Sequence, residues 1–267
     1  EICACLVGSE MCIRDRVNDL NIAGMTMSVY NLISQYILII GSIVALVFLA
    51  VAGNEKRAAA GLTRQNWKSA VFIVLLFVGI YIVRTVVSMA GQGVSDGSGM
   101  QYVKEWAAMF KNPMMWLNIA ALPINYFFVF IAFFGEEYGW RYYLQPVLQK
   151  RFGLRAGVII LGVVWGLWHI PDDLFYYTQT SGIQMIFAQQ ITCISLGIFF
   201  AYAYMKTQNI WVPVCLHYLN NNLIPIISGT FSADVLENQT VSWKDLPVAL
   251  VLNGLCFGFF LLADVFK

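Results

Sequence analysis

The chain has 267 residues, of which 59% are hydrophobic and only 12% charged, with a net charge of +1 and a mean hydropathy of +0.68. Soluble domains carry about 25% charged residues, so this composition indicates an integral membrane protein whose first partner is the lipid bilayer. The small net charge gives no indication of a nucleic-acid partner. The six cysteines form no CxxC pair, which argues against a disulfide framework and a thiolate metal site.

Residues 1–16 differ in character from the rest of the chain. Residues 6–16 show no hydrophobic periodicity and are similar to the translation of a sequencing adapter. We therefore expect residues 1–16 to be a non-native tail and exclude them from fold reasoning; a genuine short polar tail is the alternative. On the first interpretation, the natural N-terminus is missing, and whether an upstream helix is missing with it stays open.

Seven apolar segments are long enough, or nearly so, to cross a membrane, which takes about 20 helical residues. Gly and Pro within them are compatible with membrane helices, and no internal repeat stands out. We expect an all-α fold, a polytopic membrane helix bundle of about seven transmembrane helices. The segments are residues 28–52, 69–90, 114–134, 156–170, 183–205, 210–227 and 246–263.

The charges between these segments predict the orientation of the bundle. One set of loops and the C-terminal tail carry ten Lys and Arg residues, and the opposite set carries three. By the positive-inside rule the basic side, with the C-terminus, is cytoplasmic. Asp172 and Asp173 then fall in an outer loop, where we expect both to be solvated. Arg84 lies within the second segment, where either snorkelling or a partner is possible.

Glu136, Glu137 and Arg141 directly follow the third segment. A charged side chain inside a membrane costs about 2.5 kcal/mol or more and is usually retained for a function. On a helix, Glu137 and Arg141 are four residues apart and form an ion pair, while Glu136 points about 100° away. We expect a structural Glu137–Arg141 pair that leaves Glu136 as the candidate base. A solvated pair of glutamates near a helix end is the alternative.

The two histidines of the chain, His169 and His217, both lie in apolar segments. Asn221 follows His217 by four residues and shares its helix face. If the helix with Glu136 continues to a turn at residues 152–153, Glu136 and His169 are equally far from that turn and meet at one depth of a hairpin. The spacing therefore permits a Glu/His/His/Asn cluster inside the membrane. Each histidine alone could equally be a satisfied polar contact between helices.

Three motifs in chain order resemble the signature of a known family. They are Glu136-Glu137-x-x-x-Arg141, Trp165-x-x-x-His169 and His217-x-x-x-Asn221, and they are similar to those of type II CAAX prenyl endopeptidases and bacteriocin-processing (CPBP, Abi) intramembrane proteases. One departure is Trp165, where the family usually has Phe. The resemblance covers about residues 114–228, which we expect to form the catalytic core. Residues 17–113 would form two N-terminal transmembrane helices, and residues 229–267 an outer loop and a C-terminal transmembrane helix.

The resemblance implies an intramembrane endopeptidase with a catalytic cavity inside the bundle. Its substrate would be a membrane-associated peptide or protein, CAAX-like or bacteriocin-related. Glu136 would activate a water that His169 helps to hold, and His217 and Asn221 would donate hydrogen bonds to the oxyanion. Glu137, Arg141 and Trp165 would support these residues.

Other interpretations remain open at this stage. Family members are also classed as metalloproteases, so Glu136, His169 and His217 could instead ligate one zinc ion; no HExxH element is present, and we favour metal-free activation of water. A non-catalytic bacteriocin-immunity or partner-binding membrane protein is the rival function. A transporter with an ionisable site at the membrane midplane is less favoured, because no inverted repeat stands out.

Overall fold

The computed structural model describes residues 20–22, 25–27, 39–40, 42–44, 46–48, 50–52, 61–62, 65–95, 98, 100–229, 235 and 238–267. These residues are helical almost throughout, and the expected all-α bundle is confirmed. The exception is a small antiparallel hairpin of β1 (Leu20–Ile22) and β2 (Met25–Met27). The expected tail, residues 1–16, and much of the first predicted span, residues 28–52, lie outside the described residues.

From α6 to α11 the helices follow one another with connections of a few residues. A π-helix, η1 (Tyr138–Leu144), joins α6 to α7, and two 3₁₀-helices, η2 (Gly258–Leu262) and η3 (Asp264–Phe266), follow α13. The α-helices are α4 (Trp67–Ser95), α5 (Gln101–Met109), α6 (Pro113–Glu137), α7 (Gln145–Phe152), α8 (Leu154–Trp168), α9 (Ile170–Phe175), α10 (Gly182–Thr207), α11 (Trp211–Ser228) and α13 (Asp245–Cys256).

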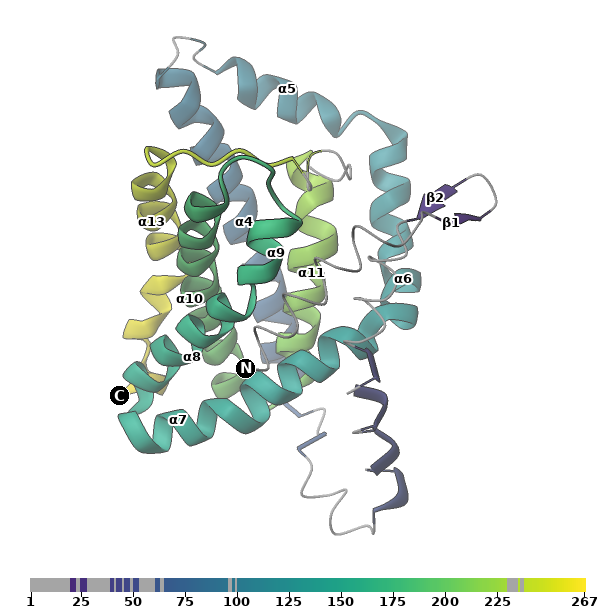
Figure 1. Ribbon diagram of the computed structural model, residues 1–267, viewed down its shortest axis with the longest axis vertical. Helices are drawn as coiled ribbons and strands as arrows, with labels where there is room; N and C mark the ends of the chain where they lie inside the picture. Colours follow the sequence, from purple (N-terminus) through teal and green to yellow (C-terminus); the bar gives the residue numbers. More distant parts are fainter. Residues whose placement is uncertain are drawn as a thin grey trace.

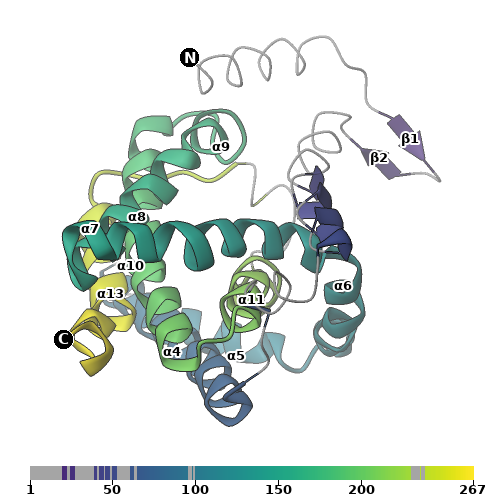
Figure 2. The same cartoon turned by 90° about the horizontal axis from the view of Figure 1, so that it is seen from below.

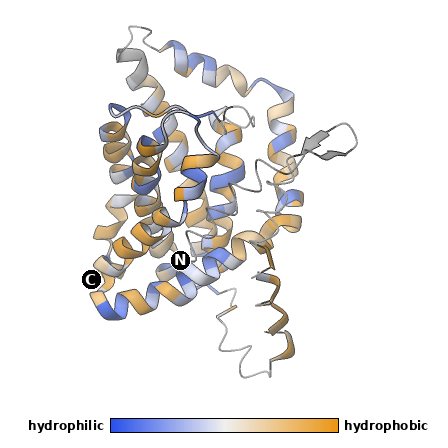
Figure 3. Cartoon of the chain, viewed as in Figure 1, coloured by the Kyte–Doolittle hydropathy of each residue, from blue (hydrophilic) through white to orange (hydrophobic). Residues whose placement is uncertain are grey.

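Four helical runs among the described residues are long and apolar enough to cross a membrane: Trp67–Gly91, Pro113–Phe152, Leu154–Phe175 and Gly182–Thr207. Figure 3 shows the bundle mainly in hydrophobic colours, with more hydrophilic turns in α5 and α7. These runs make the chain an integral membrane protein by composition, with fewer clear spans than the seven segments expected. α11 has 18 residues, but its histidine and three asparagines lower its hydropathy.

Helix α10 forms the centre of the bundle and packs against α8, α9, α11, α13 and α4 (Figure 1). Its buried face includes Phe199 and Phe200, which belong to an aromatic core with Phe77 of α4 and Phe257. The backbone of α10 comes very close to that of α8, where a Cβ placed on Gly162 would lie 2.6 Å from the Cα of Ile194. Glycine at this position lets the two backbones meet, as small residues do between membrane helices.

The segment from α6 to α7 is one continuous helical run. It begins at Asn112, whose side chain accepts a hydrogen bond from the Met114 backbone N–H at 3.0 Å, an N-cap that satisfies a free backbone donor. Pro123 and the π-helix η1 interrupt its α-helical hydrogen bonding, and such interruptions kink helices. Figure 1 shows that the run bends, so that its second part crosses the base of the bundle. In Figure 2 this part lies between α9 on one side and α11 and α4 on the other.

The run ends at Gly153, where the chain turns into α8. Gly153 has φ of +87°, a conformation that other residues rarely adopt. The predicted turn at residues 152–153 is therefore confirmed, as is the continuation of the helix beyond Glu136 that this prediction required. The two arms of the hairpin, α7 and α8, pack against each other.

Two expectations about local structure are wrong. Asp173 is fully buried, because residues 170–175 form the short helix α9 packed against α10 instead of a solvated loop. Asp172, its neighbour on α9, is only partly exposed. The predicted continuous span 246–263 also breaks, since α13 ends at Cys256 and η2 continues the chain as a 3₁₀-helix.

Candidate active site

Glu137 and Arg141 form the predicted ion pair, deep inside the protein. Arg141 Nε lies 3.2 Å from Glu137 Oε2, and an Arg141 terminal N–H donates to Oε1 at 3.3 Å. Neither side chain has any solvent exposure. The Arg141 guanidinium also lies 4.6 Å from the ring centre of Trp165 and 5.1 Å from that of Phe200, contacts that stabilise a cation away from water. The pair is thus a buried structural element and not a solvated interface.

Glu137 has a second partner, which the sequence did not predict. His217 Nδ1 lies 2.8 Å from Glu137 Oε1, and because a carboxylate only accepts, Nδ1 carries the proton. The ring of His217 is buried and meets the ring of Phe133 edge-on, with centres 5.2 Å apart. Glu137 therefore ties α6 to α11 and fixes the orientation of the His217 ring, leaving its Nε2 as the nitrogen that can face a substrate.

Trp165 connects the two histidines. Its ring centre lies 5.8 Å from that of His169 and 5.5 Å from that of His217, both edge-on. The backbone carbonyl of Trp165 lies 2.9 Å from His169 Nδ1. Since a carbonyl only accepts, Nδ1 donates this hydrogen bond and the neutral ring keeps a lone pair on Nε2. Nε2 of His169 can therefore hold a water molecule.

Glu136 differs from Glu137 in its surroundings. Its side chain is only partly buried, and its carboxylate interacts electrostatically with His217 and Asp172. It is thus close to the histidine cluster without sharing the ion pair of Glu137. This arrangement leaves its carboxylate available for a reacting group, and its role as base stays a prediction.

Asn221 lies one helical turn after His217 on α11. Its side chain is exposed, and its Oδ1 accepts a hydrogen bond from the Asn220 amide at 2.9 Å. The structure thus brings His169 and His217 against Trp165, with Glu136 close enough to His217 to interact electrostatically and Asn221 one turn further along α11. The role of Asn221 also stays a prediction.

Two residues near this group were missed or misplaced by sequence reasoning. Phe200 of α10 contacts Arg141, and its ring centre lies 6.2 Å from that of His217, but in the sequence it is one of many apolar residues of a span. Asp173 follows His169 by one turn, and neither of its buried oxygens has a hydrogen-bond partner among the described residues. Its position next to a motif histidine was visible in the sequence, but its burial was not.

The zinc alternative requires three donor side chains around one point. Among the described residues, no three His, Cys, Asp or Glu side chains have that arrangement. Glu136, His169 and His217 therefore do not fit a zinc site, and we derive no step of a reaction through a metal.

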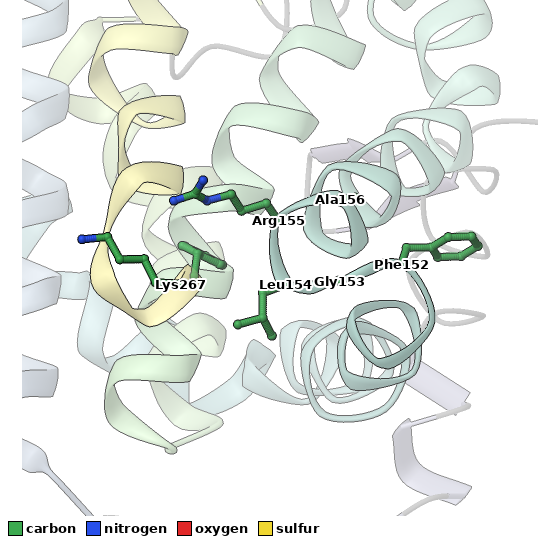
Figure 4. Close-up of a pocket in the computed structure, with 7 residues that line it drawn as sticks. Phe152, Gly153, Leu154, Arg155, Ala156 and Lys267 are labelled. Atoms are coloured by element: carbon green, nitrogen blue, oxygen red, sulfur yellow. The ribbon is translucent and has the colours of Figure 1, made fainter.

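A separate hollow of about 540 Å³ opens at the turn between α7 and α8. Figure 4 shows its lining residues, which include Phe152, Leu154, Arg155 and Lys267. It contains none of the predicted site residues. The expected catalytic cavity inside the bundle stays a prediction.

Comparison with known proteins connects this arrangement with a family. Residues 118–223 match the model of the family "Type II CAAX prenyl endopeptidase Rce1-like", a stretch that contains all three motifs. This match covers less than half of the chain, and it makes the matched part similar to CAAX proteases. The resemblance expected from the motifs is thus confirmed, and the buried cluster lies within the matched part of the chain.

A curated relative points the same way. The chain is 27% identical over 125 residues to CAAX prenyl protease 2 of Methanococcus maripaludis, a match that covers 43% of this chain and 45% of that protein. The chain therefore spans less than half the length of this curated relative. No solved structure gives a significant match.

Proposed function

We propose that the protein is an intramembrane endopeptidase that hydrolyses a peptide bond of a membrane-associated substrate. The observation that carries the proposal is the contact of His217 with Glu137, at 2.8 Å, beside Trp165 and His169. Three helices supply this polar group within a largely apolar bundle. Ionisable groups held at such a position are expensive and are usually retained for function.

The reaction needs an activated water. Glu136 is the base, because its partly exposed carboxylate takes no part in the ion pair that occupies Glu137. It removes a proton from water, and the hydroxide forms a bond to the carbonyl carbon of the substrate. When the C–N bond breaks, the same carboxyl returns the proton to the leaving amine. His169 accepts a hydrogen bond from the water through Nε2 and aligns it.

The negative charge on the carbonyl oxygen needs hydrogen-bond donors. His217 supplies one from Nε2 when its ring is protonated, and the Glu137 carboxylate at Nδ1 stabilises that charged ring. Asn221, on the same face of α11, supplies another from its amide. Glu137, Arg141 and Trp165 act on the reaction only through the histidines that they orient.

The family and the relative suggest the substrate class. Both are named for CAAX prenyl processing, so the first substrate to test is a peptide with a prenylated C-terminal cysteine motif. The distribution of basic loops supports a cytoplasmic C-terminus and a site open to the cytoplasmic half of the membrane. A bacteriocin-related peptide is the second substrate class.

The test uses the full chain reconstituted in liposomes and a fluorescence-quenched peptide ending in a farnesylated Cys-aliphatic-aliphatic-X sequence. We expect cleavage by the native protein and none by Glu136→Gln, with both proteins folded and inserted alike. Glu105→Gln, the same change at an exposed glutamate of α5, should keep full activity. Full activity of Glu136→Gln would reject Glu136 as the base.

The rival function is distinguished by the same variant. A non-catalytic immunity or partner-binding protein would bind its partner, and protect cells, equally well with Glu136→Gln. A native protein that leaves both the farnesylated peptide and a bacteriocin precursor uncleaved, yet protects cells, would contradict the endopeptidase proposal.

A further inference from the structure

A chain of hydrogen bonds reaches Asn221 from a helix outside the three motifs. The hydroxyl of Tyr81, on α4, donates to Asn220 Oδ1 at 2.5 Å. The amide of Asn220 then donates to Asn221 Oδ1 at 2.9 Å. Tyr81 lies outside the matched residues 118–223, so this link connects α4 to the site.

The direction of these bonds determines how the Asn221 amide is turned. An asparagine side chain has one accepting oxygen and one donating NH₂ group. Because the Asn221 oxygen accepts from Asn220, its NH₂ group points the other way, and no described residue provides an acceptor for it. The Asn220 amide is turned in the same manner, since its oxygen accepts from Tyr81. An oxyanion donor must present NH₂ to the substrate, which is the orientation that the chain produces.

Tyr81 is itself held firmly. It is 5% exposed, and its ring packs against Phe77 and Phe257, with ring centres 4.9 and 5.1 Å away. The Arg84 guanidinium lies 5.7 Å from the centre of the Tyr81 ring. The Arg84 charge, for which the sequence indicated no definite partner, thus lies against an aromatic ring. The same contact leaves the phenol of Tyr81 little freedom to turn.

We propose that Tyr81 and Asn220 are positioning residues that hold the Asn221 amide with its NH₂ group towards the carbonyl oxygen of the substrate. The inference rests on the proposed function, because it assigns Asn221 to the oxyanion. Neither Tyr81 nor Asn220 touches the substrate; both act through Asn221.

The test compares the rate of cleavage of the farnesylated peptide by four variants. Removing an oxyanion donor lowers kcat by about 10²- to 10³-fold, which we expect for Asn221→Ala. Tyr81→Phe and Asn220→Ala leave the donor in place but free to turn, so we expect each to lower kcat by about 10- to 100-fold with KM unchanged. The double variant Tyr81→Phe with Asn221→Ala should be no slower than Asn221→Ala alone, because the relay has then lost its target.

A matched control comes from the same helix as Asn221. The hydroxyl of Tyr218 is also part-buried, donating to the Leu122 carbonyl at 2.8 Å and to Asn125 at 3.0 Å. Tyr218→Phe removes the same atom without touching the relay, so its kcat should stay within about twofold of the native value. Thermal unfolding of all variants shows whether a loss of rate is a loss of folded protein.

The outcomes separate the relay from the proposed function. If Asn221→Ala is slow and Tyr81→Phe is as fast as the native protein, the relay is wrong and the endopeptidase proposal stands. If the losses of Tyr81→Phe and Asn221→Ala multiply in the double variant, Tyr81 acts elsewhere and the relay is overturned. If Asn221→Ala keeps full activity, the relay fails together with the role of Asn221, while Glu136→Gln still decides whether the protein is a hydrolase.

Discussion

Replacing Glu137 by Gln should cost stability, whereas the same change at Glu136 should cost only activity. Glu137 and Arg141 have no solvent exposure, and removing one partner of a buried ion pair destabilises by about 3–5 kcal/mol. The contacts of Arg141 with Trp165 and Phe200 remain, and the new amide oxygen can still accept from His217. We therefore expect Glu137→Gln to lower the free energy of unfolding by about 3 kcal/mol, the lower end of this range, which changes the unfolding equilibrium constant roughly 100-fold.

The assay measures unfolding in detergent micelles together with cleavage of the farnesylated peptide. Glu136→Gln, at a partly exposed position with no ion pair to another described residue, should stay within about 0.5 kcal/mol of native stability and lose all activity. Glu137→Gln should keep measurable activity in its folded fraction. A further Arg141→Met change in Glu137→Gln should restore part of the stability, because it removes the uncompensated charge. Equal stability of both single variants, combined with total loss of activity in both, would refute this division of roles.

Two further predictions concern packing. Asp173→Leu should raise the stability by about 1–3 kcal/mol, because it replaces a buried carboxyl that has no hydrogen-bond partner among the described residues by an apolar side chain of similar shape. The exposed Asp245→Leu, which removes the acceptor of the Ser242 N–H, should lower the stability slightly. A stability loss in Asp173→Leu would contradict the reasoning. Gly162→Ala should destabilise by about 1–3 kcal/mol, because its Cβ would lie 2.6 Å from the Cα of Ile194. A Cβ added at Gly79 would have no other atom within 4 Å, so Gly79→Ala serves as the control in the same unfolding assay. Equal effects of both changes would show that close contact between helices is not the cause of the destabilisation.

Local features of the structure followed from the sequence. The spacing of Glu137 and Arg141 predicted their ion pair, and the glycine after the basic residues at 150 and 151 predicted the turn at Gly153. Both depend on residues within one turn of each other, where helix geometry is enough. The membrane class followed from composition alone.

Long-range features did not follow in the same way. Glu137 and His217 are 80 residues apart, and periodicity tells which face of a helix is polar but not which helices are neighbours. Asp173 was expected in a solvated loop, because a carboxylate after an apolar segment normally marks a loop. The π-helix η1 was also missed, since a pattern with 3.6 residues per turn contains no sign of the extra residue that widens a turn.

The bend in the run from Pro113 to Phe152 limits how this run can sit in a bilayer. Its 40 residues would reach about 60 Å as a straight rod, twice the roughly 30 Å of a hydrocarbon layer. One part of the run can cross the hydrocarbon layer only if the other part lies parallel to the membrane plane, within the layer or along its surface. Glu136 lies at the end of α6, next to the π-helix η1 that interrupts the run. Under the proposed function, a lipid-anchored substrate diffusing in the plane of the membrane would therefore meet this carboxylate beside an interruption and not in the middle of a straight spanning helix.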